Sequence, residues 1–273
     1  MAVRWLPANN LLVLQHLAVY RFLTVPQLIG LGVAKHKSTV YDILKRFDRF
    51  PRKLIDRKKF NFVSGRGNIH MVLYLTRGGT ELLAEHYGVD PGRIKYPRGQ
   101  TIFVNDYYHR IATIDFHIAL RQWAENAGAT VDFFETYFDK TGSNRGGVGQ
   151  RLRAKTRVDV GKEFFNADAI YRTTKSNGSQ WLVIFEMHNG HDSGRFLKQL
   201  DIRLLALEEG SINDQYEFFD PCILECVFEH ESTMRAVIKR VRQAEDLTGF
   251  REYVSFNTIE NVRTDFAVGW QHF

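Results

Sequence analysis

The sequence predicts an α/β (α+β) protein of two domains, and three observations lead to this prediction. Charge is unevenly divided, because residues 1–100 hold 17 of the 37 Lys and Arg but 6 of the 31 Asp and Glu, a net charge of +11 against −5 for the remainder. Residues 90–105 contain Pro and Gly without periodicity. Mainly helical patterns precede this stretch, and strands alternate with helices after it. We therefore expect domains at 1–92 and 105–273, joined by a linker at 93–104.

Composition favours a globular protein without a membrane span. The 44% hydrophobic and 25% charged contents are ordinary for a soluble chain. The most apolar run, residues 11–25, is interrupted by Gln15, His16 and Arg21 and falls short of the roughly 18 residues that a membrane helix needs. The N-terminus lacks the apolar stretch of a signal peptide. We expect a cytoplasmic protein, with Cys222 and Cys226 as buried reduced thiols in a strand.

The first domain has the pattern of three helices followed by a hairpin. Residues 9–21 show helical apolar spacing, and Thr24-Val-Pro-Gln27 has the capping-box pattern of a second helix. Ser38 is the expected N-cap of a third helix, STVYDILKRF. Two strand-like stretches, LIDRKKFNFV and MVLYLT, flank a Gly-containing tip, and GGTELLAEHYG is a closing helix. This order predicts a winged helix-turn-helix.

A basic winged helix predicts contact with double-stranded DNA. The third helix would enter the major groove, and the hairpin would reach the neighbouring backbone. Such a fold can instead mediate dimerisation or protein contact, but crowded basic side chains on the wing would be costly in a protein interface. The candidate DNA-binding residues are Lys35, Lys37, Ser38, Thr39, Tyr41 and Lys45 around the helix, and Arg57, Lys58, Lys59 and Arg66 on the hairpin.

A carboxylate stands at each free end of a predicted hairpin in the second domain. FFNADAIYRTT and QWLVIFEMH are typical of strands, and KSNGS of a turn. If the loop is Ser176 to Gly178, Asp168 and Glu186 become direct cross-strand partners, about 5 Å apart at Cβ. A two-residue Asn177-Gly178 loop would instead place them on opposite faces.

Two adjacent carboxylates predict a cation between them. Like charges at this distance repel, and oxygen ligands suit Mg²⁺ or Mn²⁺. Such an ion polarises a phosphoryl oxygen and lowers the pKa of bound water. An ordinary solvated strand end is the alternative, but the buried run WLVIF before Glu186 favours a site. The Gly/Arg-rich stretch at 143–157 lacks the GxxxxGK[ST] spacing of a phosphate loop and is expected to be mobile.

The hairpin resembles the PD-(D/E)xK nuclease pattern, written here as Asn-Ala-Asp168 and Glu186-Met-His188. Two departures are the Asn-Ala before Asp168, where Pro often stands, and His188 in place of the usual Lys. The resemblance implies a restriction-endonuclease-like mixed-sheet domain. It also implies a catalytic set and a metal set: Asp168, Glu186, His188 and Lys198 for catalysis, and Asp168, Glu186 and Glu135 for Mg²⁺ or Mn²⁺.

The whole chain resembles the replication-relaxation family of plasmid proteins and the related MobC-class mobilisation relaxases. The matching stretches are LYLTRGGTELL, NDYYHRIATIDFHIAL, the carboxylate hairpin and the helix of Lys198. The resemblance implies a bacterial, metal-dependent endonuclease that nicks one strand at a plasmid origin of transfer, with accessory mobilisation or coupling proteins as partners. Water or a tyrosine could be the attacking group. A non-catalytic replication or transcription regulator is the alternative, favoured by the missing Lys at position 188, and a double-strand nuclease is a weaker one.

Overall fold

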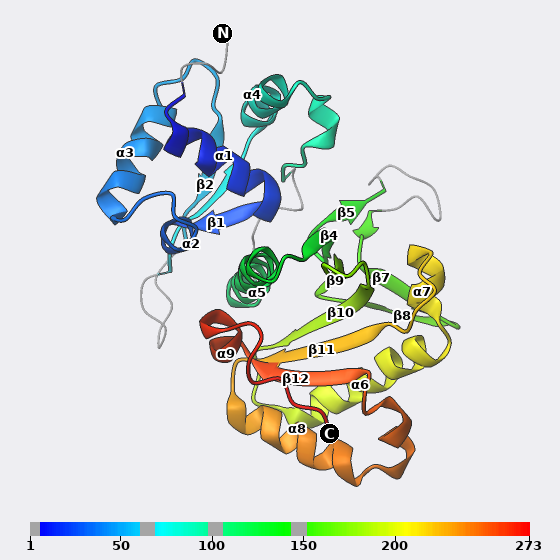
Figure 1. Ribbon diagram of the computed structural model, residues 1–273. Helices are drawn as coiled ribbons and strands as arrows, with labels where there is room; N and C mark the ends of the chain where they lie inside the picture. Colours follow the sequence, from blue (N-terminus) through cyan, green and yellow to red (C-terminus); the bar gives the residue numbers. More distant parts are fainter. Residues whose placement is uncertain (1–5, 61–68, 98–105, 143–151) are drawn as a thin grey trace. The chain divides into compact units, whose positions relative to one another are not determined.

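The computed structural model describes residues 6–60, 69–97, 106–142 and 152–273. The chain divides into two compact units, Met1–Asn105 and Asp106–Phe273. Both combine helices and strands, so the predicted α/β class is confirmed at that level (Figure 1). Within the described ranges, no helix has both the length and the apolar content needed to cross a membrane.

The first unit packs helices around a small antiparallel sheet. The sheet has the order β1-β3-β2. Its central strand β3 is covered on both faces, since every residue of β3 is buried. The elements are α1 (Ala8–Tyr20), β1 (Phe22–Thr24), α2 (Val25–Gly30), α3 (Lys37–Phe47), β2 (Ile55–Lys58), β3 (Val72–Leu75), α4 (Arg77–Tyr87) and the short 3₁₀ turn η2 (Pro91–Arg93).

Local capping explains where α2 begins but not where α3 begins. The predicted capping box of α2 is confirmed, because Gln27 N–H donates to Thr24 Oγ1 at 3.3 Å and Thr24 N–H donates to Gln27 Oε1 at 2.8 Å. The predicted cap at Ser38 is wrong. Helix α3 already begins at Lys37, and its N-cap residue His36 makes no side-chain capping bond. The exposed start of α3 leaves its first amides accessible to water, so a side-chain cap is not required there.

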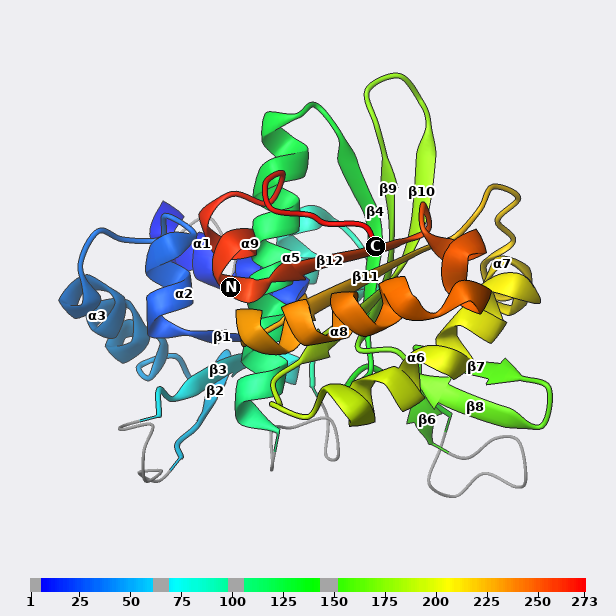
Figure 2. The same ribbon diagram turned by 90° about the horizontal axis from the view of Figure 1, so that it is seen from below.

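The second unit is built on a five-stranded mixed sheet of order β12-β11-β10-β9-β4. Strands β4, β9 and β10 are antiparallel neighbours, whereas β10, β11 and β12 run parallel and are joined through helices (Figures 1 and 2). The elements are α5 (Tyr107–Asn126), β4 (Thr130–Thr136), β5 (Lys140–Thr141), β6 (Arg153–Ala154), β7 (Arg157–Val160), β8 (Glu163–Asn166), β9 (Ala169–Thr174), β10 (Gln180–His188), α6 (Ser193–Glu208), α7 (Ser211–Tyr216), β11 (Ile223–Phe228), α8 (Glu231–Gln243), η4 (Glu245–Phe250), β12 (Val254–Thr258) and α9 (Ile259–Thr264).

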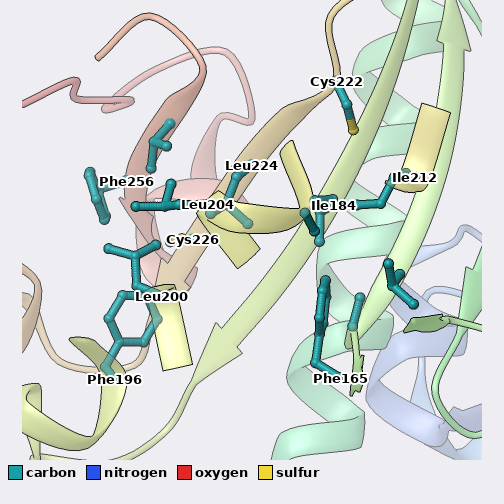
Figure 3. Close-up of a cluster of buried hydrophobic side chains, with 14 of the residues drawn as sticks. Phe165, Ile184, Phe196, Leu200, Leu204, Ile212, Cys222, Leu224, Cys226 and Phe256 are labelled. Atoms are coloured by element: carbon teal, nitrogen blue, oxygen red, sulfur yellow. The ribbon is translucent and has the colours of Figure 1, made fainter. Parts of the chain in front are cut away.

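Helices cover both faces of this sheet and create two apolar cores. Along β10, Leu182 and Ile184 face α6 and α8, whereas Val183 and Phe185 face α5 and α9. Figure 3 shows the first of these clusters, in which helix and strand side chains interdigitate. Cys222 and Cys226 belong to it as free, buried thiols, as the sequence predicts, but only Cys226 lies in a strand, because β11 begins after Cys222.

The β9–β10 pairing has the register expected of a three-residue loop. Phe185 pairs with Ala169, and the loop is closed by the Lys175 N–H, which donates to Ser179 O at 2.8 Å. Gly178 supplies the left-handed conformation, with φ of 85°. The loop length and register are therefore as predicted, and the strand pairing ends one residue before Asp168 and Glu186.

The expected single strand FFNADAIYRTT is two strands. β8 ends at Asn166 and pairs with β7, and β9 starts at Ala169 in the main sheet. Between them the Ala167 N–H donates to Thr156 O at 3.0 Å, and the Thr156 hydroxyl donates to Ala167 O at 2.5 Å. These bonds hold the chain away from the main sheet, so Asp168 lies at a bend. The Gly/Arg-rich stretch contributes β6 and the start of β7, while its residues 143–151 lie outside the described ranges.

Candidate functional site

Asp168 connects the hairpin to helix α5. Its Oδ2 accepts the Met187 N–H at 2.7 Å, and its Oδ1 lies 2.7 Å from His109 Nε2. The carboxylate side chain is 13% exposed. Both oxygens therefore have partners from within the protein, one from β10 and one from the first turn of α5.

His109 is held in its protonated form between two acceptors. Its Nδ1 lies 2.9 Å from Asn189 Oδ1, and the Asn189 amide nitrogen donates to Glu229 Oε2 at 3.1 Å, which fixes the amide orientation. Burial lowers the pKa of His109, but the charge of Asp168 and the bonds to Asp168 and Asn189 outweigh it and raise the pKa to about 9. Two ring nitrogens that both face acceptors can both donate only as imidazolium.

Glu186 forms a buried ion pair with Arg203 of α6. Arg203 Nε lies 2.5 Å from Glu186 Oε1, and the side chains are 9% and 7% exposed. The two atoms are at ion-pair distance without hydrogen-bond alignment. Burial raises the pKa of Glu186 to about 7, with the charge of Asp168 adding to the rise and Arg203 opposing it. The Arg203 guanidinium also lies over the Phe165 ring and donates to Gln199 O at 2.6 Å.

Glu135 belongs to a different ion pair. It lies on β4 opposite Ile170, and its two oxygens accept from Lys155 Nζ and, at 3.2 Å, from the Tyr216 hydroxyl. Across the described ranges, no three His, Cys, Asp or Glu side chains are grouped so that they could hold a metal ion. The structure therefore brings Asp168 and Glu186 together, but it does not add Glu135 to them as a third ligand.

His188 and Lys198 do not face the carboxylates. The His188 ring packs between Phe196 and Phe228, with centroid distances of 5.3 and 5.5 Å, and its buried Nε2 has no hydrogen-bond partner. Burial, assisted by Arg195, lowers the pKa of His188 and favours the neutral ring. Lys198 is exposed on α6, about 140° around the helix from Arg203. The cation that reaches Glu186 is thus Arg203 and not the expected Lys198.

Tyr137 lies beside this cluster and stays a phenol. Its hydroxyl donates to Asp106, which also accepts from Arg110 at 3.0 Å, and its ring packs edge-on to His109. Burial, followed by the charge of Asp106, raises the pKa of Tyr137. In this arrangement the Tyr137 hydroxyl is hydrogen-bonded to the Asp106 carboxylate.

Most candidate DNA-binding residues of the first unit are exposed. Tyr41 is half-buried with Lys37 Nζ 5.8 Å from its ring centroid, and Lys45 pairs with Asp42 at 3.4 Å. Arg57 is half-buried and directed at Asp48. Arg66 lies outside the described residues. The exposed candidates are Lys35, Lys37, Ser38, Thr39, Lys45, Lys58 and Lys59.

Arg203 and Asn189 are the site residues that the sequence patterns did not point to. The position of Arg203 in the sequence could still have indicated a buried role, because it lies on the apolar stripe of α6 that includes Phe196, Leu200 and Leu204. A basic residue on a buried stripe needs an acidic partner. Asn189 carries no comparable signal, since an Asn after a strand is ordinary for a turn.

Comparison with protein-family models, with curated proteins and with solved structures finds no match for this chain. Function is therefore inferred from the residues and their geometry.

Proposed function

We propose that the protein binds double-stranded DNA through its first unit and nicks one strand at the site around Asp168 and Glu186. The observation that carries this proposal is a pair of adjacent, largely buried carboxylates at the end of the β9–β10 hairpin, each contacted by a cation from a different helix. Burying four charged groups together is energetically costly, and such clusters concentrate at functional sites. A mixed sheet covered by helices on both faces supports a nuclease-like second domain.

The first unit supports the DNA-binding part of the proposal. Three helices are followed by the β2–β3 hairpin, the order of a winged helix-turn-helix. Lys35 and Lys37 stand at the start of α3, and Lys58 and Lys59 at the described end of the hairpin. None of these four forms an ion pair with a described residue, so their charges are available for phosphates.

The carboxylate oxygens of Asp168 and Glu186 are the type of ligand that Mg²⁺ or Mn²⁺ prefers, but they already contact groups of the protein. Magnesium is commonly held by one or two carboxylates together with phosphate and water, which Asp168 and Glu186 could provide. When bound, the ion would polarise the scissile phosphate and lower the pKa of an attacking water. His109 and Arg203 compete for the same oxygens. Once they release the carboxylates, both cations can stabilise negative charge on the phosphate.

The finer form of the proposal is a plasmid mobilisation relaxase. In this form the nick is placed at an origin of transfer, and accessory mobilisation or coupling proteins join the complex. It rests on the resemblance of the chain to replication-relaxation and MobC-class proteins. The target sequence would be read by α3 and the hairpin, while the second unit supplies the chemistry.

A non-catalytic DNA-binding regulator is the second candidate, and the contacts of Arg203 and His188 favour it. Arg203 neutralises Glu186 from within the protein, and His188 is packed between two phenylalanines instead of facing the carboxylates. In this case the charged cluster would stabilise the domain, and the nuclease-like fold would serve for dimerisation or partner contact.

Nicking of supercoiled plasmid separates the two candidates. The plasmid carries the protein's own origin region, and the protein is added with Mg²⁺ or Mn²⁺. We expect open circles from the wild type and a loss of about 100-fold or more in rate for Asp168→Asn and Glu186→Gln. Glu163→Gln, an exposed carboxylate on β8, serves as the matched control. Binding to the same duplex is measured in parallel by fluorescence anisotropy and should change little in all variants. Retained binding without nicking by the wild type would establish the regulator instead.

A further inference from the structure

A cavity of about 410 Å³ lies on the α5 side of the main sheet, next to the C-terminal segment. Aromatic side chains dominate its walls: Trp123 of α5, Tyr171 of β9, Trp181 of β10, and Phe266 and Trp270 after α9. Glu225 of β11 also lines it. Glu225 faces α5 together with Tyr171 and Val183, whereas Glu186 faces α6, so this cavity is separate from the carboxylate pair described above.

Glu225 is a buried carboxyl that forms no ion pair with any residue the structure describes. It is 8% exposed, and its Oε2 accepts the Tyr171 hydroxyl at 2.6 Å. No described Lys, Arg or His forms an ion pair with it, in contrast to Glu186 and Glu135. Burial raises the pKa of Glu225 to about 7, and the Tyr171 bond offsets only part of that rise. A second lining carboxylate, Glu252, is exposed and likewise has no ion pair among the described residues.

We propose that this cavity binds a small organic cation, a protonated amine carried on an apolar body. Indole and phenol rings attract cations through their faces, and a desolvated cation gains more from such contacts. The Trp181 indole already takes part in one contact of this kind, with Lys175 Nζ 3.6 Å from its centroid. Glu225 would receive the ammonium group as the orienting polar residue of an otherwise apolar pocket. The apolar body would fill the space among the aromatic walls.

The charges around the cavity agree with this ligand class. Among the described residues, Glu225 and Glu252 are its acidic lining residues and His272 is its basic one. Lys175 Nζ lies over the Trp181 ring. His272 Nδ1 is engaged with Val254 O at 3.0 Å. A bound ammonium favours the ionised form of Glu225, so binding near neutral pH should release a proton from the protein.

Calorimetric titration with benzylammonium and with benzyl alcohol, two probes of nearly equal size, tests the proposal on the full-length protein. At pH 8 we expect benzylammonium to bind at least about 10-fold more tightly, the ratio that one charge-assisted hydrogen bond supplies. Glu225→Gln keeps an acceptor for the Tyr171 hydroxyl and should abolish the preference for the cation. Glu163→Gln, remote from the cavity lining, should leave it unchanged.

Two further results decide the outcome. Trp270→Leu should weaken the binding of both probes, which would place their binding site in this cavity. This variant also locates the binding site if Glu225→Gln does not fold. Equal affinity for the two probes, or a cation preference that survives Glu225→Gln, would overturn the proposal. Absence of saturable binding by either probe to the folded wild type would overturn it as well. None of these results depends on DNA nicking.

Discussion

At the scale of single residues, the cluster around Asp168 is defined by partners that lie far apart in sequence. His109, Asn189 and Arg203 come from α5, the loop after β10, and α6, and they reach the two carboxylates only because the fold places these elements around the start of β9 and the end of β10. Each carboxylate has a cation within the protein. The stability of the fold should therefore depend on these charges independently of any catalytic role.

His109 predicts a dependence of stability on pH. Its folded pKa of about 9 lies above the ordinary value of 6.5, so its contribution is complete below pH 6.5 and is lost as pH rises through 9. The raised pKa of Glu186 acts in the same direction between about pH 4.5 and 7. We expect the free energy of unfolding to fall from pH 6.5 to 9, measured by urea denaturation. His109→Gln should flatten this fall, whereas His36→Gln, at an exposed position, should not. A profile unaffected by His109→Gln would contradict the ion pair.

Arg203 predicts a large loss of stability on substitution. Arg203→Met leaves Glu186 buried beside Asp168 without its cation, which should cost about 3–5 kcal/mol in the free energy of unfolding. The double variant Arg203→Met/Glu186→Met removes both charges and should recover most of this loss. Arg195→Met, an exposed position on the same helix, should stay within about 0.5 kcal/mol of the wild type. A small effect of Arg203→Met in denaturant unfolding would mean that Glu186 is solvated or neutral in the folded protein.

At the scale of elements, the hairpin turn determines which residues become neighbours. Gly178 has φ of 85°, a conformation that costs an L-residue about 1–2 kcal/mol. Gly178→Ala should therefore lower the free energy of unfolding by about that amount. Gly249→Ala provides the control, because Gly249 has no positive φ and a Cβ there would meet nothing within 4 Å. Equal stability of the two variants would show that the loop can adopt another turn, and with it another register.

Local chemistry explains which elements could be predicted from the sequence. The register that joins Asp168 to Glu186 follows from one glycine and a short loop, and the capping box of α2 from Thr24 and Gln27. Contacts with distant segments were not predictable in this way. The strand break at Asp168 depends on Thr156, and the charge balance of Glu186 depends on Arg203. Glu225 is similar, since its carboxyl faces a cavity formed by four other elements and the C-terminal segment.

At the scale of the whole molecule, charge is divided between the two units. The first hundred residues carry a net charge of +11 and the remainder −5. The acidic unit should repel a polyanion, and the basic unit should attract it. If the site in the acidic unit acts on DNA, the basic unit must therefore supply the affinity for DNA.

This division predicts a strong dependence of DNA binding on salt, and the prediction rests on the proposed function. Each phosphate that a Lys or Arg neutralises contributes a slope of about −0.9 to the dependence of log affinity on log salt. Lys58→Gln and Lys59→Gln together should reduce the magnitude of the slope by about 2 and weaken binding similarly on all duplex sequences. Arg77→Gln removes an exposed cation that is already paired with Glu81, and should change the slope little. Anisotropy titrations from 50 to about 300 mM salt measure these slopes. A slope that Lys58→Gln/Lys59→Gln leaves unchanged would move the DNA contact away from the hairpin, to the start of α3.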